Sequence, residues 1–371
     1  MILFDFRYQD PWAEDTIAFP NFIEQTQSRQ RQDQQADINR QTLDTLLAKL
    51  SQRDVVGLDH AKEYLRHKYR QNCKANTLKN DFTTITLFLS YLKSCAKSEL
   101  NQVGRKDLEA FVEHEQDRGL KIVSVSNRLG SLYAFLRYLI EQELADAQLL
   151  TRKIKLKVPD ALPRAMDPDD VKCLLAVLDD IRNRAMILLL LRTGMRIGEL
   201  LNAKVLDVHL TDKKIMIYEG EKNRKGRAVC ISDDACQALD DWMQKRDAQK
   251  QYLIYSQGRH RMSYNNARVI FKKCLTRAGL EHKDYSLHCL RHTFATELLN
   301  AGMRIECLQQ LLGHSSIEMT LRYARLSDKT REHEYFKAMA IIEGEPIDEP
   351  DQRDHQLPPL FEETQLLSPY A

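Results

Sequence analysis

Apolar residues recur at three- and four-residue spacing along the first half of the chain, which is the period of an amphipathic helix. The stretch NDFTTITLFLSYLKS carries one such apolar face, and SVSNRLGSLYAFLRYLIEQ carries a second. Both follow Ser, Thr or Asn residues that suit helix caps. Residues 46–157 are therefore expected to form a helical domain, with core-facing positions Phe82, Ile85, Phe88, Leu89 and Leu92 in the first stretch and Leu129, Leu132, Leu136, Leu139 and Ile140 in the second.

The pattern changes near residue 157. KLKVPDALPRAMDPDD contains three prolines, which break helical periodicity, so residues 158–167 are expected to be a linker. Helical patterns resume in DPDDVKCLLAVL and on both sides of the Thr-Gly pair in RNRAMILLLLRTGMRIGELLNAK. KKIMIYEGEKNRKGRAVCIS alternates as a β-hairpin does, with glycines and basic residues at its tip. Residues 168–327 are thus expected to be a mixed domain.

The two ends of the chain differ from these domains in composition. Residues 1–45 end in the Gln-rich QTQSRQRQDQQADINRQ and form a polar arm, either flexible or a solvated helix. Residues 328–371 contain a last helical pattern, TREHEYFKAMAIIE, and an acidic tail with prolines. The expected fold class is mainly α with a small β-hairpin or sheet (α+β), in which a linker joins the helical domain to the mixed one.

Composition places the chain among ordinary globular proteins and restricts its surroundings. Of 371 residues, 43% are hydrophobic and 29% are charged, and the formal net charge is +2. Because the tail is acidic, the rest is more basic than the total indicates. We find no apolar run near the roughly 20 residues that span a bilayer and no secretion signal. The eight cysteines show no metal-ligand spacing, so reduced thiols in a cytoplasm are expected.

Basic residues stand at two turns of the mixed domain. Arg196 follows the Thr-Gly turn in RTGMRIGEL, where a guanidinium can reach into a cleft. The hairpin tip GEKNRKGR carries Lys222, Arg224, Lys225 and Arg227, which suit contacts with DNA phosphates. Taken alone, each of these signals is weak, because solvated arginines and basic turns are common.

Two histidines, an arginine and a tyrosine follow on predicted helices. His288 and Arg291 in SLHCLRHTFATELLNAG are three residues apart and share a helix face. His314 precedes Tyr323 across the loop in LLGHSSIEMTLRYARLSD. Such a tyrosine or histidine, judged alone, is more often a core residue than a reactive one.

The combination favours one kind of chemistry. A phosphodiester under attack gains negative charge, which guanidinium forks can bind when no carboxylate cluster holds Mg²⁺. A phenol with a pKa of about 10 needs a neighbouring base or cation to become a nucleophile. The set therefore favours phosphoryl transfer through Tyr323, without a cofactor or a metal.

At this point the sequence resembles the tyrosine recombinases, the family of phage-type integrases and Xer-type recombinases. The resemblance rests on the order Arg, Lys, His-x-x-Arg, His, Tyr and on the strings TGMRIGEL, HCLRHTFAT and LLGHSSIEMTLRYA. It covers about 165 to 328, and the two N-terminal helical stretches resemble the family's SAM-like core-binding domain. It implies a site-specific DNA recombinase that cuts and rejoins strands through a 3′-phosphotyrosyl intermediate, without ATP.

The resemblance also implies a role for each matching residue. Tyr323 would be the nucleophile, and Arg196 and Arg291 would bind the non-bridging oxygens. His314 would donate a further hydrogen bond and His288 would take the tyrosine proton. Lys222 would protonate the departing 5′ oxygen, with Lys225 in the same tip as the alternative lysine. Glu199 is expected to be a structural acid that supports nearby helices.

The implied partner is double-stranded DNA, bound at specific sites by a homotetramer that joins two duplexes, with C-terminal helix exchange and accessory DNA-bending proteins as possible additions. The same resemblance implies that the protein is located in a bacterial cytoplasm and associates with the nucleoid. A membrane is not an expected partner. Candidate DNA contacts in the helical domain are the basic residues off the apolar faces, Lys74, Lys79, Arg128 and Arg137. The extensions at both ends favour the integrase of a mobile element.

Three alternatives remain open at this stage. Xer-type dimer resolution and a type IB topoisomerase would use similar chemistry. A helix-turn-helix regulator would account for HTFATELLNAGMRIECLQQLLGHSS, because a turn with Gly302 separates two helical patterns there. A regulator would leave the recombinase-like positions of Arg196, Lys222, His314 and Tyr323 unexplained.

Overall fold

The computed structural model describes residues 22–159, 163–218 and 226–324, together with Tyr335, Met339 and Ile342. The chain divides into two compact units, residues 1–160 and 161–371. Within the described ranges, none of the helices combines the length and the apolar character that crossing a membrane requires.

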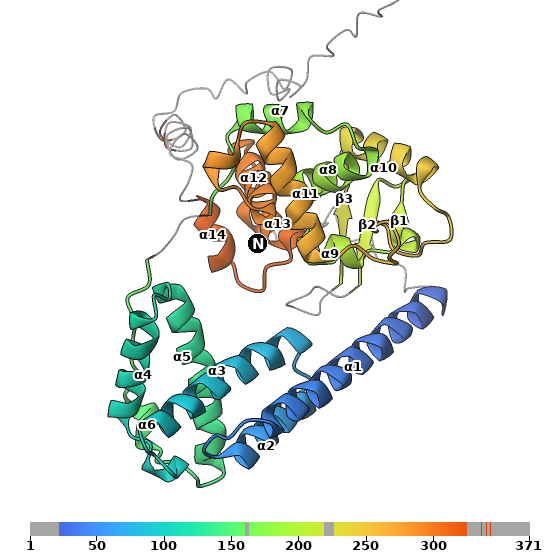
Figure 1. Cartoon of the computed structure of the whole chain (residues 1–371). Helices are drawn as coiled ribbons and strands as arrows, with labels where there is room; N and C mark the ends of the chain where they lie inside the picture. The colour runs from blue at the N-terminus through green and yellow to red at the C-terminus, as the bar shows by residue number, and fades with distance from the viewer. Residues whose placement is uncertain are drawn as a thin grey trace, which may run out of the picture. The chain divides into compact units, whose positions relative to one another are not determined.

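The first unit is helical, as predicted (Figure 1). Its described residues form five helices and two short elements: α1 (Phe22–Ser51), α2 (Leu58–Arg70), α3 (Ala75–Ser94), the 3-10 turn η1 (Leu100–Gln102), α4 (Arg105–Asp117), α5 (Ile122–Glu141) and the single turn α6 (Gln148–Thr151).

The predicted apolar faces of α3 and α5 form the core of this unit. Ile85, Phe88, Leu89 and Leu92 are at most 1% exposed, and their counterparts on α5 are buried except Ile140, which like Phe82 is half-buried. Aromatic rings add edge-to-face contacts, such as Tyr64 against Phe135 at 5.2 Å between centroids. The 3.6-residue period therefore identified the packed faces, and the two exceptions lie at their margins.

Helix α1 crosses the boundary that the sequence predicts at residue 45. Leu43, Leu46 and Leu50 are buried in the core of the first unit. Their three- and four-residue spacing gives the end of α1 an apolar face, whereas the preceding Gln-rich stretch has few apolar side chains to bury. Residues 22–45 are thus helical, and most side chains of residues 36–45 are exposed, as the solvated-helix alternative predicts for that part.

The second unit combines eight helices of its described residues with a small antiparallel sheet of order β1-β2-β3. The elements are α7 (Pro168–Ala176), α8 (Ile181–Thr193), α9 (Ile197–Asn202), η2 (Val205–Asp207), β1 (Val208–His209), β2 (Lys214–Ile217), β3 (Arg227–Cys230), α10 (Asp233–Lys245), α11 (Tyr264–Arg277), η3 (Glu281–Lys283), α12 (Leu287–Asn300), α13 (Ile305–Leu312) and α14 (Glu318–Ala324).

The predicted hairpin is present as strands β2 and β3. Lys214 pairs with Cys230 and Ile217 with Arg227, so the chain between the paired ends contains the basic tip. Strand β1, which pairs with β2 through Val208 and His209, was not predicted, because two residues are too few to show alternation.

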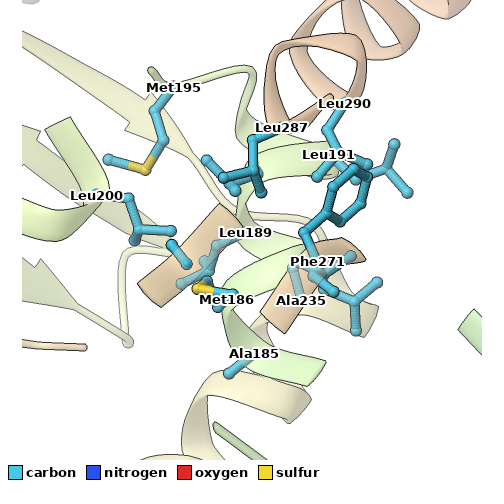
Figure 2. Packing of buried hydrophobic residues seen from close by; sticks show 14 of the residues in the cluster. Ala185, Met186, Leu189, Leu191, Met195, Leu200, Ala235, Phe271, Leu287 and Leu290 are labelled. Atoms are coloured by element: carbon cyan, nitrogen blue, oxygen red, sulfur yellow. The ribbon is translucent and has the colours of Figure 1, made fainter. Parts of the chain in front are cut away.

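Helix α8 lies at the centre of this unit's core. Its side chains from Ala185 to Leu191 are all at most 2% exposed, so the helix is apolar on every side, as a central helix must be. Figure 2 shows Met186 and Leu189 of α8 among Phe271 of α11 and Leu287 of α12. Because α8 is enclosed by other helices, the turn that follows it is held in a fixed place.

Candidate active site

The turn after α8 positions Arg196. Helix α8 ends at Gly194, whose φ of 59° lies in the left-handed region that favours glycine. A Cβ at Gly194 would lie 2.2 Å from Cδ1 of Phe294 on α12, so no larger residue fits there. Arg196 then caps the N-terminus of α9. The Thr-Gly pair thus brings the end of α8 against α12, and α9 begins at Ile197, directly after this turn.

Glu199 is the acceptor that joins two arginines of the site. Its Oε2 accepts from the backbone N–H of Arg196 at 2.8 Å, and its Oε1 accepts from Arg196 Nη1 at 3.0 Å. Arg227 donates to the same two oxygens at 3.0 and 2.7 Å. The Glu199 side chain is fully buried. The prediction of a structural acid is confirmed by these contacts.

Burial by itself raises the pKa of the Glu199 carboxyl. The hydrogen bonds and charge of Arg227, with those of Arg196, outweigh burial, and the net result is a pKa below the usual value. Glu199 is therefore ionised at neutral pH, and its single negative charge is shared by two guanidinium groups.

Arg227 lies inside this network. The sequence places it among the phosphate-contacting residues of the hairpin tip, but its side chain is only 10% exposed. Besides Glu199, its Nε donates to the carbonyl of Leu311 at 3.0 Å. Arg227 thereby connects strand β3 to helices α13 and α9. These contacts hold the three elements together.

Arg291 is the most enclosed cation of the site, with 1% exposure. It donates to the carbonyls of Gly194 and Leu312, the latter at 2.7 Å, and to His314 Nε2 at 3.0 Å. Burial, and then the charge of Arg196, lower the pKa of Arg291 to about 10. The guanidinium still carries its charge at neutral pH, and it lies close to that of Arg196.

The contacts of His314 define its tautomer. A guanidinium nitrogen can only donate, so His314 Nε2 accepts from Arg291, and the ring proton lies on Nδ1. Nδ1 then donates to Thr320 Oγ1 at 2.9 Å. Burial and the charge of Arg291 lower the pKa of His314 to about 3, which agrees with a neutral ring.

Tyr323 on α14 is at once packed and close to the cations. It is 3% exposed and belongs to a small apolar cluster with Ala295, Leu299, Leu308 and Leu312. Its ring is nearly parallel to that of His314, 6.2 Å away. Burial raises the pKa of Tyr323, and the charge and a hydrogen bond of Arg291 partly offset that rise. The core and the reactive interpretations of this tyrosine are thus compatible.

A histidine that the sequence did not single out contacts Tyr323. His292 Nδ1 lies 2.9 Å from Tyr323 Oη. His288, expected to take the tyrosine proton, lies one turn earlier on α12 with its ring 4.4 Å from that of His292, and it is exposed. The i,i+4 spacing in HCLRH is the signal that could have found His292, because such residues share a helix face.

The other predicted residues belong to the hairpin tip and to the first unit. Lys222, Arg224 and Lys225 fall outside the described residues. In the first unit, Lys79 and Arg137 are exposed, whereas Lys74 and Arg128 are half-buried. Arg128 forms an ion pair with the buried Glu115, so it contributes to that unit's own packing.

Comparisons with known proteins give a consistent result. Residues 164–330 match the phage integrase family, and residues 62–143 match the phage integrase N-terminal SAM-like domain. A tyrosine recombinase XerC of Leptospira interrogans is 30% identical over 300 residues, which is 75% of this chain and 92% of that protein. A tyrosine recombinase XerA of Pyrococcus horikoshii is 28% identical over 261 residues, 70% of this chain and 88% of that protein.

A solved structure shares the fold. The Tn1549 transposon integrase in complex with a circular intermediate DNA has a TM-score of 0.61 and 21% identity. The similarity covers 73% of this chain and 95% of that one. The helical domain followed by a mixed domain is therefore an arrangement already seen in a solved integrase.

We expect Glu199→Gln to lower the free energy of unfolding at pH 7 by about 3–5 kcal/mol, because it leaves two buried guanidinium groups without a counter-charge. The folded-state pKa of Glu199 is lowered, so its contribution is present above the unfolded pKa and is lost as pH falls through the folded pKa. The difference in free energy of unfolding between wild type and Glu199→Gln should therefore become smaller at acid pH. Urea unfolding followed by circular dichroism at several pH values measures it.

The matched control is Glu281→Gln, at an exposed position of the same unit. Equal stability of wild type and Glu199→Gln at pH 7, or a gap that stays constant with pH, would contradict the assigned role of the carboxylate.

Proposed function

The chain belongs to the tyrosine recombinases of the phage integrase family, and from that premise we propose that Tyr323 is its DNA-cleaving nucleophile. Enzymes of this family are site-specific recombinases, which cleave and rejoin DNA strands. The observation that carries the proposal is the place of the phenol, which is hydrogen-bonded to His292 and influenced by the charges of Arg291 and Arg196.

In the proposed reaction, Tyr323 attacks a phosphate of duplex DNA, forms a 3′-phosphotyrosyl link and releases a 5′ hydroxyl. The link conserves the energy of the broken bond, so rejoining to another 5′ hydroxyl needs no ATP. Arg196 and Arg291 bind the non-bridging oxygens. The structure supports this role because both guanidinium groups are largely buried and close together. In such a site each interaction with an anion is stronger than in water.

The proposed role of His314 requires a change in its protonation. In the structure its Nε2 accepts from Arg291, so it can donate to a phosphate oxygen only after it acquires a proton there. Nearby cations contribute to its low pKa. A bound phosphate anion would offset those cations and favour the protonated ring.

Lys222 is proposed to protonate the departing 5′ oxygen, on the basis of the family resemblance. The residues that flank its hairpin tip support this. Strand β3 begins at Arg227, which is bound to Glu199 and to the Leu311 carbonyl. The first residue of β3 after the tip is therefore held in the cluster, which supports a catalytic role for a lysine of this hairpin.

The burial of Tyr323 adds a requirement. With 3% of the residue exposed, a DNA phosphate reaches the phenol only if side chains that cover Tyr323 move aside. Helix α14 has seven residues, and Leu321 on it is 44% exposed, so part of its surface makes no apolar contacts that oppose a local movement.

We further propose that the protein acts as a tetramer on two duplexes, with the segment after residue 328 docking on a neighbouring subunit. Tyr335 and Ile342 are 60% and 75% exposed. Two large apolar side chains at helical spacing with this exposure suit a face that another subunit covers. Phe336 lies outside the described residues.

Tyr323→Phe should abolish covalent protein–DNA adducts on a nicked suicide substrate, because the variant has no oxygen to attack phosphorus. Duplex binding should be unchanged, since phosphate contacts by Lys and Arg supply most of the affinity. Denaturing gel electrophoresis detects the adduct and a mobility shift measures binding. Tyr264→Phe, at an exposed position, is the control. Adducts formed by Tyr323→Phe would refute the assignment.

Truncation after residue 327 keeps Tyr323 and removes the proposed docking segment. It should reduce recombination between two sites, and assembly on DNA, more than it reduces binding to a single site. Sedimentation of DNA complexes and a two-site recombination assay measure both effects. An unchanged yield of recombinants would count against the docking segment.

We propose a mobile element as the biological setting, because residues 1–45 and 331–371 extend beyond the matching regions. Integration copies part of the attachment site to both ends of the element. The expected observation is a pair of short repeats bracketing a DNA segment that contains the gene. A conserved chromosomal setting with a single recombination site and no such repeats would favour dimer resolution.

A further inference from the structure

We propose that His292 is a catalytic residue that takes the phenolic proton of Tyr323 as the tyrosine oxygen attacks phosphorus. The inference rests on the proposed function and deepens it. It assigns to His292 a role that the family resemblance would give to His288.

The geometry that supports it comes from a single helix. On α12, His288 and His292 are one turn apart and Arg291 lies beside them, so one stretch of helix supplies two imidazoles and a guanidinium. Of these two rings, His292 is the one whose nitrogen lies 2.9 Å from Tyr323 Oη. A proton acceptor must be within hydrogen-bonding reach of the proton it takes, and His292 meets that requirement.

The proposal requires one direction for the hydrogen bond between Tyr323 and His292. Arg291 carries only N–H donors, so it cannot accept the phenol hydrogen. The phenol has one hydrogen to give, and His292 Nδ1, 2.9 Å from the phenol oxygen, is placed to accept it. This requires a bare lone pair on Nδ1 and the ring hydrogen on Nε2.

The surroundings keep His292 neutral, as an acceptor must be. Burial, the neighbouring His288, and the charges of Arg291 and Arg322 lower the pKa of His292 to about 4. A phosphate anion bound by Arg196 and Arg291 would oppose the effect of these cations. The basicity of His292 should therefore rise when the substrate is in place, which is when the proton must move.

The step balances without another reactant. The O–H bond of Tyr323 breaks and an N–H bond forms on His292, while the tyrosine oxygen bonds to phosphorus and the bond from phosphorus to the 5′ oxygen breaks. That oxygen takes its proton from Lys222. In the rejoining step the His292 imidazolium returns its proton to the departing tyrosine oxygen, and Lys222 takes back the proton of the attacking 5′ hydroxyl.

The decisive variant is His292→Asn. Its amide oxygen can occupy the place of Nδ1 and accept the phenol hydrogen, but it cannot take the proton. We expect the rate of adduct formation on the nicked substrate to fall by roughly 10²–10⁴-fold, the usual contribution of a positioned base, with duplex binding unchanged. His282→Asn, exposed on η3, is the matched control and should behave as wild type.

A second substrate separates proton transfer from mere support of the fold. An oligonucleotide with a 3′-para-nitrophenyl phosphate can be joined to a 5′ hydroxyl strand without Tyr323, because nitrophenolate departs without a proton. His292→Asn and Tyr323→Phe should both keep the wild-type rate of this joining. His292→Gln, whose amide is equally unable to take a proton, gives the same expectation if the Asn variant does not fold.

The outcomes are distinct. Adduct formation by His292→Asn at the wild-type rate would overturn this inference, and so would loss of both reactions, which would make the role structural. If Tyr323→Phe forms no adduct in the same experiment, such a result leaves the proposed function standing. If Tyr323→Phe does form adducts, the proposed function itself fails.

Discussion

One buried carboxylate organises the cationic site. Glu199 accepts hydrogen bonds from Arg196 and Arg227, and Arg227 also binds the Leu311 carbonyl. This network connects α9, β3 and α13, which are far apart in the sequence. Without it, two guanidinium groups would be buried in low dielectric with no counter-charge, which is strongly destabilising. The single negative charge compensates the arginines only in part, so the site keeps a positive potential that suits a phosphodiester.

The same enclosure controls the reactivity of the phenol. Burial raises the pKa of Tyr323, whereas Arg291 favours its ionised form, and His292 Nδ1 lies within hydrogen-bonding distance of its oxygen. In the absence of DNA the first effect is larger, and the tyrosine stays protonated among Leu299, Leu308 and Leu312. A bound phosphate would supply the negative charge that balances the arginines of the site. The arrangement thus links the presence of DNA to activation of the nucleophile.

Much of this could be predicted from local patterns. The faces of α3 and α5, the apolar α8, the Thr-Gly turn and the β2–β3 hairpin follow from periodicity and turn chemistry, which act over a few residues. The strings around Arg196, Arg291, His314 and Tyr323 indicated both the family and the cluster. The limits of the predictions are equally physical. The boundary at residue 45 divides one helix, and strand β1 is too short to leave a period in the sequence.

The sequence by itself determined which side chains were available and on which elements they stand, because helix and strand formation depends on near neighbours. Only the tertiary structure decided which atoms meet. Arg227, expected among the phosphate contacts of the hairpin tip, binds Glu199, and His292, which the sequence did not single out, lies at the phenol oxygen. The physical reason is that hydrogen bonding is defined to within tenths of an ångström. The approach of α12 to α14 that sets these distances results from packing between segments remote in the chain, to which no local pattern is sensitive.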